Sequence, residues 1–208
     1  MHDIVVAKDR AMLAPIPSIP DDGKPIAVVI VLDPSGSMES LRGDVVPGLK
    51  SLTSGLKKLS RDVVMSVRTF NDSSEWLVEA KPIQLINETV FDAYLPAGGT
   101  ALYQTTSRAV RGMAEAFKEF DGHVLFIVFS DGMDNSSGVK YPASSVRTLV
   151  DIQTRKGWTF LFFGLGDQML KNQGTSMGIG HSVVVPHTGE GVTNAFRSVS
   201  DTLTGRPF

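Results

Sequence analysis

Four short, continuous runs of mainly apolar residues constrain the fold of this chain more than any other feature of its sequence. They read IAVVIVL at 26–32, VLFIVF at 124–129, WTFLFF at 158–163 and SVVV at 182–185. All four are far shorter than the roughly 20 residues of a membrane-spanning helix. Apolar runs without alternation, rich in Val, Ile and Phe, are typical of strands covered by helices on both faces. The sequence therefore predicts a buried, mostly parallel sheet.

Helical spacing fills much of the sequence between and after these runs. Apolar residues recur at steps of three and four from Val45 to Leu59, from Leu102 to Phe120 and from Val192 to Leu203, and a weaker pattern covers Ala143 to Thr154. Such spacing gives a helix one apolar face, which packs against a sheet. A helix between two strands also permits the right-handed crossover that makes the strands parallel.

Residues 63–70 and 75–80 are two further strand candidates, separated by the polar segment 71–74. Four residues are too few for a parallel crossover, so this pair is predicted to be an antiparallel hairpin. The expected fold is an α/β, Rossmann-like one: a doubly wound, mostly parallel sheet with one antiparallel edge strand and helices on both faces.

The first 25 residues differ from the rest of the chain. They contain a short strand candidate at 4–7, followed by prolines at positions 15, 17, 20 and 25. We expect residues 1–25 to be an extended arm that packs on the domain or on a partner, and residues 26–208 to form one domain. The amino terminus lacks a basic segment followed by an apolar one, so it does not read as a secretory signal, and a cytoplasmic protein is expected.

Charge and cysteine content narrow the class of protein. The chain has 20 Lys and Arg against 22 Asp and Glu, a net charge of −2, and no Cys. The near-balance of charge argues against a nucleic-acid binder or a polybasic membrane anchor. The absence of Cys excludes disulfides, thiolate catalysis and Cys-based zinc or iron–sulfur sites, and it fits a reducing compartment.

Oxygen-bearing side chains follow two of the predicted central strands and precede one helix. Asp33, Ser35 and Ser37 follow the first long strand, Thr100 stands between a Gly-Gly turn and a helix, and Asp131 follows the next long strand. Ligands of open α/β sheets bind beyond the carboxyl ends of the strands, where these groups should meet. Carboxylates and hydroxyls suit a hard cation such as Mg²⁺, Mn²⁺ or Ca²⁺ rather than Zn²⁺. Taken alone, the first three residues would also suit a turn and a helix cap.

The order D-x-S-x-S, G-G-T and S-D-G resembles the von Willebrand factor type A domain with its metal-ion-dependent adhesion site, and the resemblance covers nearly the whole chain. The resemblance implies that Ser35 and Ser37 bind a metal directly, that Thr100 binds it directly or through water, and that Asp33 and Asp131 act mostly through water. It also implies an open coordination position that a partner's Asp or Glu carboxylate fills. No residues let us carry over the additional cation site of the integrin members.

Residues beside the proposed ligands carry further expectations. Pro34 has no backbone N–H and should stiffen the first loop. Met38 and Met133 lie close to ligands in the sequence, and Tyr103 lies just past the proposed threonine ligand, so we expect an exposed apolar rim that contacts the partner. Packing of the helix core explains Tyr103 equally well. Asp134 is interpreted as a turn residue rather than as an extra ligand.

The sequence thus predicts a non-enzymatic, metal-dependent adaptor that binds a protein partner, and neither nucleic acid nor a membrane. By resemblance it looks more like the compact bacterial type A proteins, such as those of tellurite-resistance and stress operons or those that serve AAA+ ATPases, than like adhesion receptors. That placement is an analogy, which rests on the lack of a recognisable signal, the lack of Cys and the single-domain length. The partner would then be an AAA+ ATPase or a protein encoded in the same operon.

Two alternatives stay open. One is a Mg²⁺-dependent hydrolase or phosphatase that uses the same site, and the other is a structural subunit whose site holds no metal. The D-x-D-x-T/V motif of haloacid-dehalogenase-like phosphatases fails because Ser35 stands where its second Asp belongs, and no P-loop is present. The four histidines, His2, His123, His181 and His187, lack ligand-like spacing, so no general base can be named.

Overall fold

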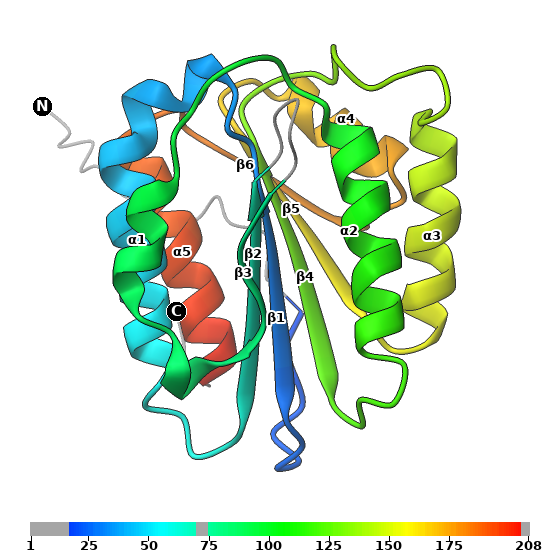
Figure 1. Ribbon diagram of the computed structural model, residues 1–208. Helices are drawn as coiled ribbons and strands as arrows, with labels where there is room; N and C mark the ends of the chain where they lie inside the picture. Colours follow the sequence, from blue (N-terminus) through cyan, green and yellow to red (C-terminus); the bar gives the residue numbers. More distant parts are fainter. Residues whose placement is uncertain (1–16, 70–74, 205–208) are drawn as a thin grey trace, which may run out of the picture.

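The protein, seen here as a computed structural model that describes residues 17–69 and 75–204, is built around one six-stranded sheet (Figure 1). Its strands lie in the order β3-β2-β1-β4-β5-β6. Their bounds are β1 Ile26–Leu32, β2 Val63–Thr69, β3 Glu75–Pro82, β4 His123–Ser130, β5 Thr159–Leu165 and β6 His181–Val185. Within the described residues, five helices accompany them, α1 Arg42–Leu56, α2 Leu102–Ala116, α3 Ala143–Arg155, α4 Met169–Ser176 and α5 Gly189–Thr204, with 3₁₀ segments η1 Gly36–Leu41, η2 Ile83–Leu85 and η3 Glu88–Ala93.

Strand directions match the sequence-based expectation. β1 pairs in parallel with β2 and β4, and β4, β5 and β6 continue the parallel arrangement. β3 pairs antiparallel with β2 and forms one edge of the sheet. The predicted doubly wound sheet with a single antiparallel edge strand is therefore confirmed. The strand candidate at residues 4–7 and the predicted link at 71–74 lie outside the described residues.

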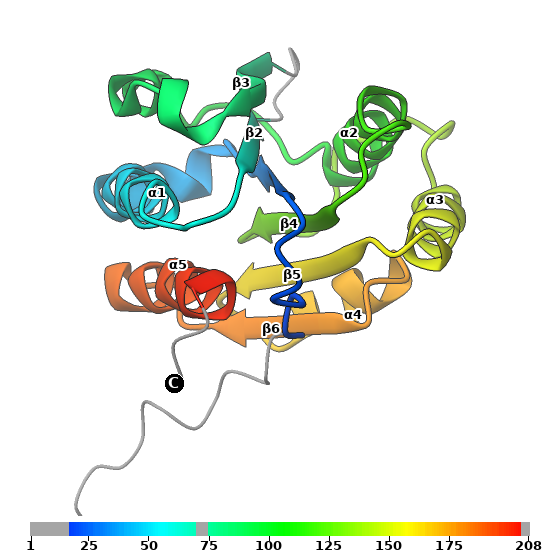
Figure 2. The ribbon, with the colours of Figure 1, turned by 90° about the horizontal axis from the view of Figure 1, so that it is seen from below.

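Helices cover both faces of the sheet, as Figure 2 shows: α1 and α5 lie on one face and α2, α3 and α4 on the other. β1 is one of the two central strands, and all seven of its residues are buried. Alternate side chains of β1 enter two separate cores, with Val28 and Ile30 toward α1 and α5, and Ala27 and Val29 toward α2 and α3. Burial on both faces explains why the first apolar run shows no alternation.

The ends of two helices, and the presence of a third helix, differ most clearly from the sequence-based expectation. α1 ends at Leu56 and α2 at Ala116, yet Leu59 and Phe120 still pack, half-buried, against the two cores. The apolar spacing therefore continues past the end of each helix, and for this reason it overstates helix length. α4 was not predicted, because its eight residues bury only Leu170, Gln173 and Gly174 and give no apolar stripe.

Residues 17–25 pack against the amino-terminal edge of the sheet. The Pro20 carbonyl accepts a hydrogen bond from Arg61 (2.8 Å), Asp22 contacts His123 at the start of β4 (3.0 Å), and Lys24 pairs with Asp121 (2.6 Å). These contacts tie the described part of the predicted arm to the domain. Among the described residues, no helix has the length and apolar character needed to cross a membrane.

Candidate metal centre

The predicted ligands lie in loops at the carboxyl-terminal edge of the sheet. This edge of the sheet is at the top of Figure 1. Asp33 extends β1 by one residue, because its N–H donates to the Phe129 carbonyl of β4 (2.9 Å). The Tyr94 hydroxyl donates to the Asp33 carbonyl (2.6 Å) from the segment that leads to α2. The first residue of the D-x-S-x-S loop is thus held by two neighbouring elements and lies beside the end of β4.

Four of the five predicted ligands form one continuous set of contacts. The Ser35 N–H donates to Asp33 Oδ1 (2.9 Å), and the hydroxyls of Ser35 and Ser37 lie 3.0 Å apart. The Ser35 hydroxyl also donates to Asp131 Oδ1 (3.2 Å), which links loops separated by 96 residues. The strand order predicted that Asp33, Ser35, Ser37 and Asp131 would meet at one edge of the sheet, and these contacts show that they do.

Thr100 lies beside this set rather than within its hydrogen bonds. A Cβ placed on Gly132 would lie 3.1 Å from Thr100 Oγ1, so the threonine hydroxyl is packed against the residue that follows Asp131. Thr100 is itself buried. In the described part of the chain, no hydrogen bond joins its hydroxyl to the serines or to either carboxylate, so a metal contact by Thr100 stays a prediction.

The loop after β4 holds Thr100 in place. Asn135 Oδ1 accepts the Thr100 N–H (2.9 Å), while the Thr100 carbonyl accepts the N–H groups of Asn135 (3.0 Å) and Ser136 (3.1 Å). Three hydrogen bonds from one loop therefore fix the backbone of Thr100. Sequence reasoning missed Asn135, because its partner lies 35 residues away and neither residue carries a local signal of the pairing.

The same loop caps helix α2 from a distance. The helix starts after Ala101, which has no capping side chain. Asp134 Oδ1 accepts the Tyr103 N–H (3.0 Å), and the Ser137 hydroxyl accepts the Gln104 N–H (2.9 Å). A carboxylate at a helix amino terminus is favourable because it satisfies free N–H groups and faces the positive end of the helix dipole. Asp134 thus caps a helix, a role that its interpretation as a turn residue did not include.

Burial dominates the electrostatics of the centre. It raises the pKa of the Asp33 carboxyl to about 6, and the negative charge of Asp131 also acts to raise it. Hydrogen bonds from the Ser130 hydroxyl (2.5 Å) and the Ser35 N–H act in the opposite direction and lower the pKa. Burial and the same two carboxylates also raise the pKa of the Tyr94 hydroxyl. Among the described residues, no Lys or Arg pairs with Asp33 or Asp131. Two carboxylates without such a partner are an environment that favours a bound cation.

The spacing of the donor atoms fits a small divalent cation. Around Mg²⁺ in octahedral geometry, neighbouring ligand oxygens lie about 3 Å apart. The Ser35–Ser37 and Ser35–Asp131 oxygen distances are 3.0 and 3.2 Å. Within residues 17–69 and 75–204, no group of three or more His, Cys, Asp or Glu could hold a metal ion. The donors here are mostly hydroxyls, so this cluster does not depend on such a group, and its residues fit a hard dication.

The predicted apolar rim is only partly correct. Met133 is 48% exposed next to the cluster. Met38, however, is completely buried: η1 turns its side chain into the core beneath α1, so its expected place on the rim is wrong. Tyr103 is half-buried and packs against the core under α2, which supports the helix-packing interpretation. Other exposed apolar side chains follow or precede elements at this edge, namely Leu95, Val139 and Met169.

One further group at this edge was not assigned from the sequence. His187 Nε2 lies 3.0 Å from Asp131 Oδ2, two residues beyond the end of β6. Its place after the carboxyl end of a strand was the available signal. The Asp131 carboxylate therefore lies between the Ser35 hydroxyl and the His187 imidazole and contacts both. In a Ser-His-Asp triad the imidazole contacts the hydroxyl instead.

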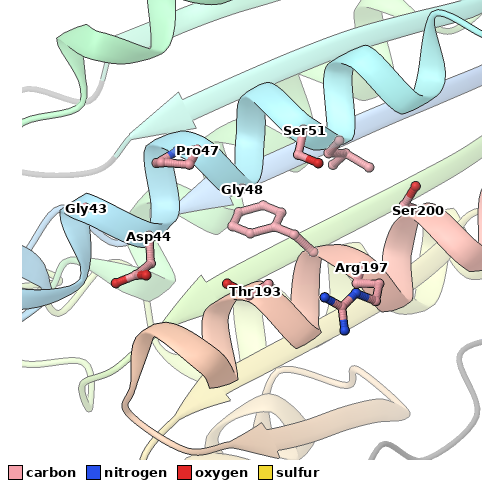
Figure 3. A pocket seen from close by; sticks show the side chains of 10 residues that line it. Gly43, Asp44, Pro47, Gly48, Ser51, Thr193, Arg197 and Ser200 are labelled. Carbon is pink, nitrogen blue, oxygen red and sulfur yellow. The ribbon is translucent and has the colours of Figure 1, made fainter.

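A groove lies away from this centre, between α1 and α5 (Figure 3). It encloses about 280 Å³, and Asp44, Gly48, Thr193 and Arg197 are among its lining residues. The Phe196 ring occupies the space where a Cβ of Gly48 would be, which lets the two helices pack closely. None of the predicted ligands lines this groove, so it plays no part in the metal centre.

No protein-family model matches this sequence, and no curated protein sequence matches it. Solved structures match the fold. The vWF domain of the type V pili tip protein Mfa5 from Porphyromonas gingivalis has a TM-score of 0.65 at 11% identity, over 89% of this chain and 95% of that chain. BatB, a conserved hypothetical protein from Bacteroides thetaiotaomicron, has a TM-score of 0.55 at 16% identity, over 85% and 98%.

A von Willebrand factor type A structure from Catenulispora acidiphila gives a TM-score of 0.62 at 15% identity. The match covers 85% of this chain but only 42% of the Catenulispora chain. Likeness at such low identity concerns the fold alone, and it agrees with the architecture built above from the strand order. The chain therefore has the fold of the von Willebrand factor type A domain.

Proposed function

We propose that this protein is a metal-dependent protein-interaction domain whose carboxyl-edge cluster binds Mg²⁺ and, through it, a carboxylate of a partner protein. One observation carries the proposal: Ser35 Oγ lies 3.0 Å from Ser37 Oγ and 3.2 Å from Asp131 Oδ1 of a separate loop, and both distances match the spacing of neighbouring oxygens around Mg²⁺. Thr100 and Asp33 would complete the site from within the same edge.

The chemistry of the donors explains why a partner carboxylate would bind. Serine and threonine hydroxyls are neutral ligands, so a dication held mainly by them keeps much of its positive charge. Asp33 and Asp131 supply negative charge that supports the cation. A bound Mg²⁺ would act as a Lewis acid that attracts a further oxygen anion. An exposed Asp or Glu of a partner is the protein group that matches this need.

Apolar groups at the same edge support a protein partner rather than a small anion. Leu95, Met133 and Met169 are 65%, 48% and 60% exposed, and each lies on a segment next to the carboxyl edge. Exposed apolar groups around a polar centre are common at interaction sites. A pilus tip protein among the structures of similar fold is consistent with an interaction role. The lack of Cys in 208 residues is compatible with the reducing, cytoplasmic setting that we propose for it.

The test is metal-dependent capture with matched variants. Immobilised wild-type protein should retain a partner from a lysate of its source with Mg²⁺ but not with EDTA. Ser35→Ala and Asp131→Ala should lose the partner, whereas Asp121→Ala, at the opposite edge, should retain it. The purified partner should then lose binding when its contacting Asp or Glu becomes the amide. Equal capture in EDTA would contradict the proposal, and phosphoester turnover lost in Asp131→Ala would favour the hydrolase.

A further inference from the structure

His187 is the exposed end of the polar contacts at the candidate metal centre. Its side chain is 35% exposed, whereas that of Asp131, which it contacts, is only 1% exposed. The two oxygens of Asp131 have different partners: Oδ1 accepts the Ser35 hydroxyl at 3.2 Å, and Oδ2 faces His187 Nε2 at 3.0 Å. A carboxylate oxygen only accepts hydrogen bonds, so the imidazole Nε2 carries the proton in this contact.

The backbone around His187 is fixed by its neighbours. The Thr188 N–H donates to the Pro186 carbonyl (2.8 Å). Thr188 also caps α5, because its hydroxyl accepts the Gly191 N–H (3.1 Å) and its carbonyl accepts the Val192 N–H (3.0 Å). His187 is therefore held between the end of β6 and a capped helix start. The backbone position from which the imidazole reaches Asp131 is therefore set before the contact forms.

The two carboxylates of the centre are held by different donors. Asp33 accepts hydrogen bonds from the Ser130 hydroxyl and the Ser35 N–H. Asp131 accepts from the Ser35 hydroxyl, and the other donor to it in the described residues is the His187 imidazole. Without His187, Oδ2 of a buried carboxylate would lose its hydrogen bond, and the carboxylate could rotate away from the serines.

We propose that His187 is a positioning residue of the metal centre, which orients Asp131 so that Oδ1 faces the Ser35 hydroxyl, itself 3.0 Å from that of Ser37. The inference rests on the proposed function, because it concerns the affinity of that same centre for its cation. His187 acts through Asp131 and makes no contact with the metal. Groups that orient a metal-binding carboxylate typically change metal affinity 10- to 100-fold when they are removed.

The experiment compares four proteins by isothermal titration calorimetry with Mn²⁺ alone: the wild type, His187→Ala, His187→Gln and His123→Ala. His123 is a matched control, because its Nε2 lies 3.0 Å from a carboxylate of Asp22 at the opposite edge. We expect His187→Ala to bind Mn²⁺ about 10- to 100-fold more weakly. His187→Gln should recover most of the affinity, because its amide N–H can replace the imidazole donor, and His123→Ala should bind like the wild type.

A second measurement does not depend on any variant. The ¹⁵N spectrum of the His187 ring in the metal-free wild type should show the proton on Nε2, and a ring protonated only on Nδ1 would overturn the inference. Unchanged Mn²⁺ affinity in His187→Ala would also overturn it while leaving the proposed function intact. A wild type that binds no Mn²⁺ would remove the proposed function, and the inference with it.

Discussion

The two edges of the sheet each pair a histidine with an aspartate at 3.0 Å, but in different surroundings. At the amino-terminal edge His123 contacts Asp22, whose side chain is 42% exposed. At the carboxyl-terminal edge His187 contacts Asp131, whose side chain is 1% exposed. The first pair is a surface contact of the kind that contributes little to stability. The second holds a carboxylate that water does not solvate.

Charge balance separates the edges further. At the amino-terminal edge Lys24 pairs with Asp121 and Arg61 with Asp21, so acidic side chains have basic partners. At the carboxyl-terminal edge burial raises the pKa of the Asp33 carboxyl to about 6, and no basic side chain in the described residues other than His187 contacts the two carboxylates. The metal-free protein therefore buries negative charge without a Lys or Arg partner at the candidate metal centre, and this burial is unfavourable.

The largest effect is expected just beneath the carboxyl-terminal edge. Met38→Ser removes a fully buried side chain and leaves a hydroxyl in the core, so it should lower the free energy of unfolding by about 4 kcal/mol. Met133→Ser changes an exposed residue, so it should alter the free energy of unfolding by about 0.5 kcal/mol or less. It should nevertheless weaken partner binding. Urea unfolding of both variants checks this. Equal, small effects would show that Met38 is not part of the core.

The dependence of stability on pH should have opposite signs at the two edges. The pKa of Asp33 is raised from 3.8 to about 6 in the fold, so its ionisation destabilises the metal-free protein as pH rises from about 4 to 7. The pKa shift corresponds to a loss of about 3 kcal/mol in the free energy of unfolding once Asp33 is ionised. Asp33→Asn, which has no ionisable group at this position, should remove this loss. Hydrogen bonding to His123 lowers the pKa of Asp22, so Asp22 stabilises the fold above its ordinary pKa and loses this effect as pH falls.

Urea midpoints measured in EDTA from pH 7 to below pH 3 provide the comparison, because Asp33 titrates within the upper part of this range and Asp22 below its ordinary pKa of 3.8. The difference between wild type and Asp33→Asn should change with pH, whereas the difference for Asp22→Asn should be small and of opposite sign. Parallel pH profiles for wild type and Asp33→Asn would show that the Asp33 carboxyl is solvated, and the contrast between the edges would then disappear.

Metal binding should stabilise the protein through one edge only. Mg²⁺ at 100 times its dissociation constant should add about 2.7 kcal/mol, which raises the Tm of a domain of this size by about 5–10 °C. Asp131→Ala should abolish the shift in thermal melts. Asp121→Ala, which removes a carboxylate from the other edge, should keep it. A shift that survives in Asp131→Ala would place the cation elsewhere.

A smaller effect should reveal how Thr100 is held. Asn135→Ala removes the acceptor of the Thr100 N–H and should cost about 1–2 kcal/mol, together with some Mg²⁺ affinity. Asn87→Ala is the matched control, because the Asn87 side chain accepts the Thr89 N–H at the start of η3. It should lower the urea midpoint without changing Mg²⁺ affinity. If both variants bind Mg²⁺ with equal affinity, Thr100 does not contribute to metal binding.

The fold was predictable because its signals are local. The four apolar runs correspond to β1, β4, β5 and β6, and the short polar link correctly made β3 antiparallel. Burial of β1 on both faces is what removes alternation from its sequence. α4 escaped prediction because a short helix at the end of the sheet buries few residues and carries no stripe.

The centre was predictable only where topology decides proximity. Asp33 and Asp131 follow adjacent parallel strands, so the edge they share follows from the strand order. Met38 was misplaced because a 3₁₀ turn, which the sequence did not indicate, directs it inward. The contacts of Asn135 with Thr100 and of His187 with Asp131 join loops that are far apart in the sequence. Patterns of neighbouring residues do not indicate such contacts.

Crystals of the wild type soaked in Mn²⁺ locate the bound cation, through anomalous difference density at the manganese absorption edge. We expect a peak at the carboxyl-terminal edge, about 2.0–2.5 Å from the hydroxyl oxygens of Ser35 and Ser37. A peak beside Asp21 and Asp22 at the opposite edge, or no peak near these serines in crystals with Mn²⁺ bound elsewhere, would contradict this expectation.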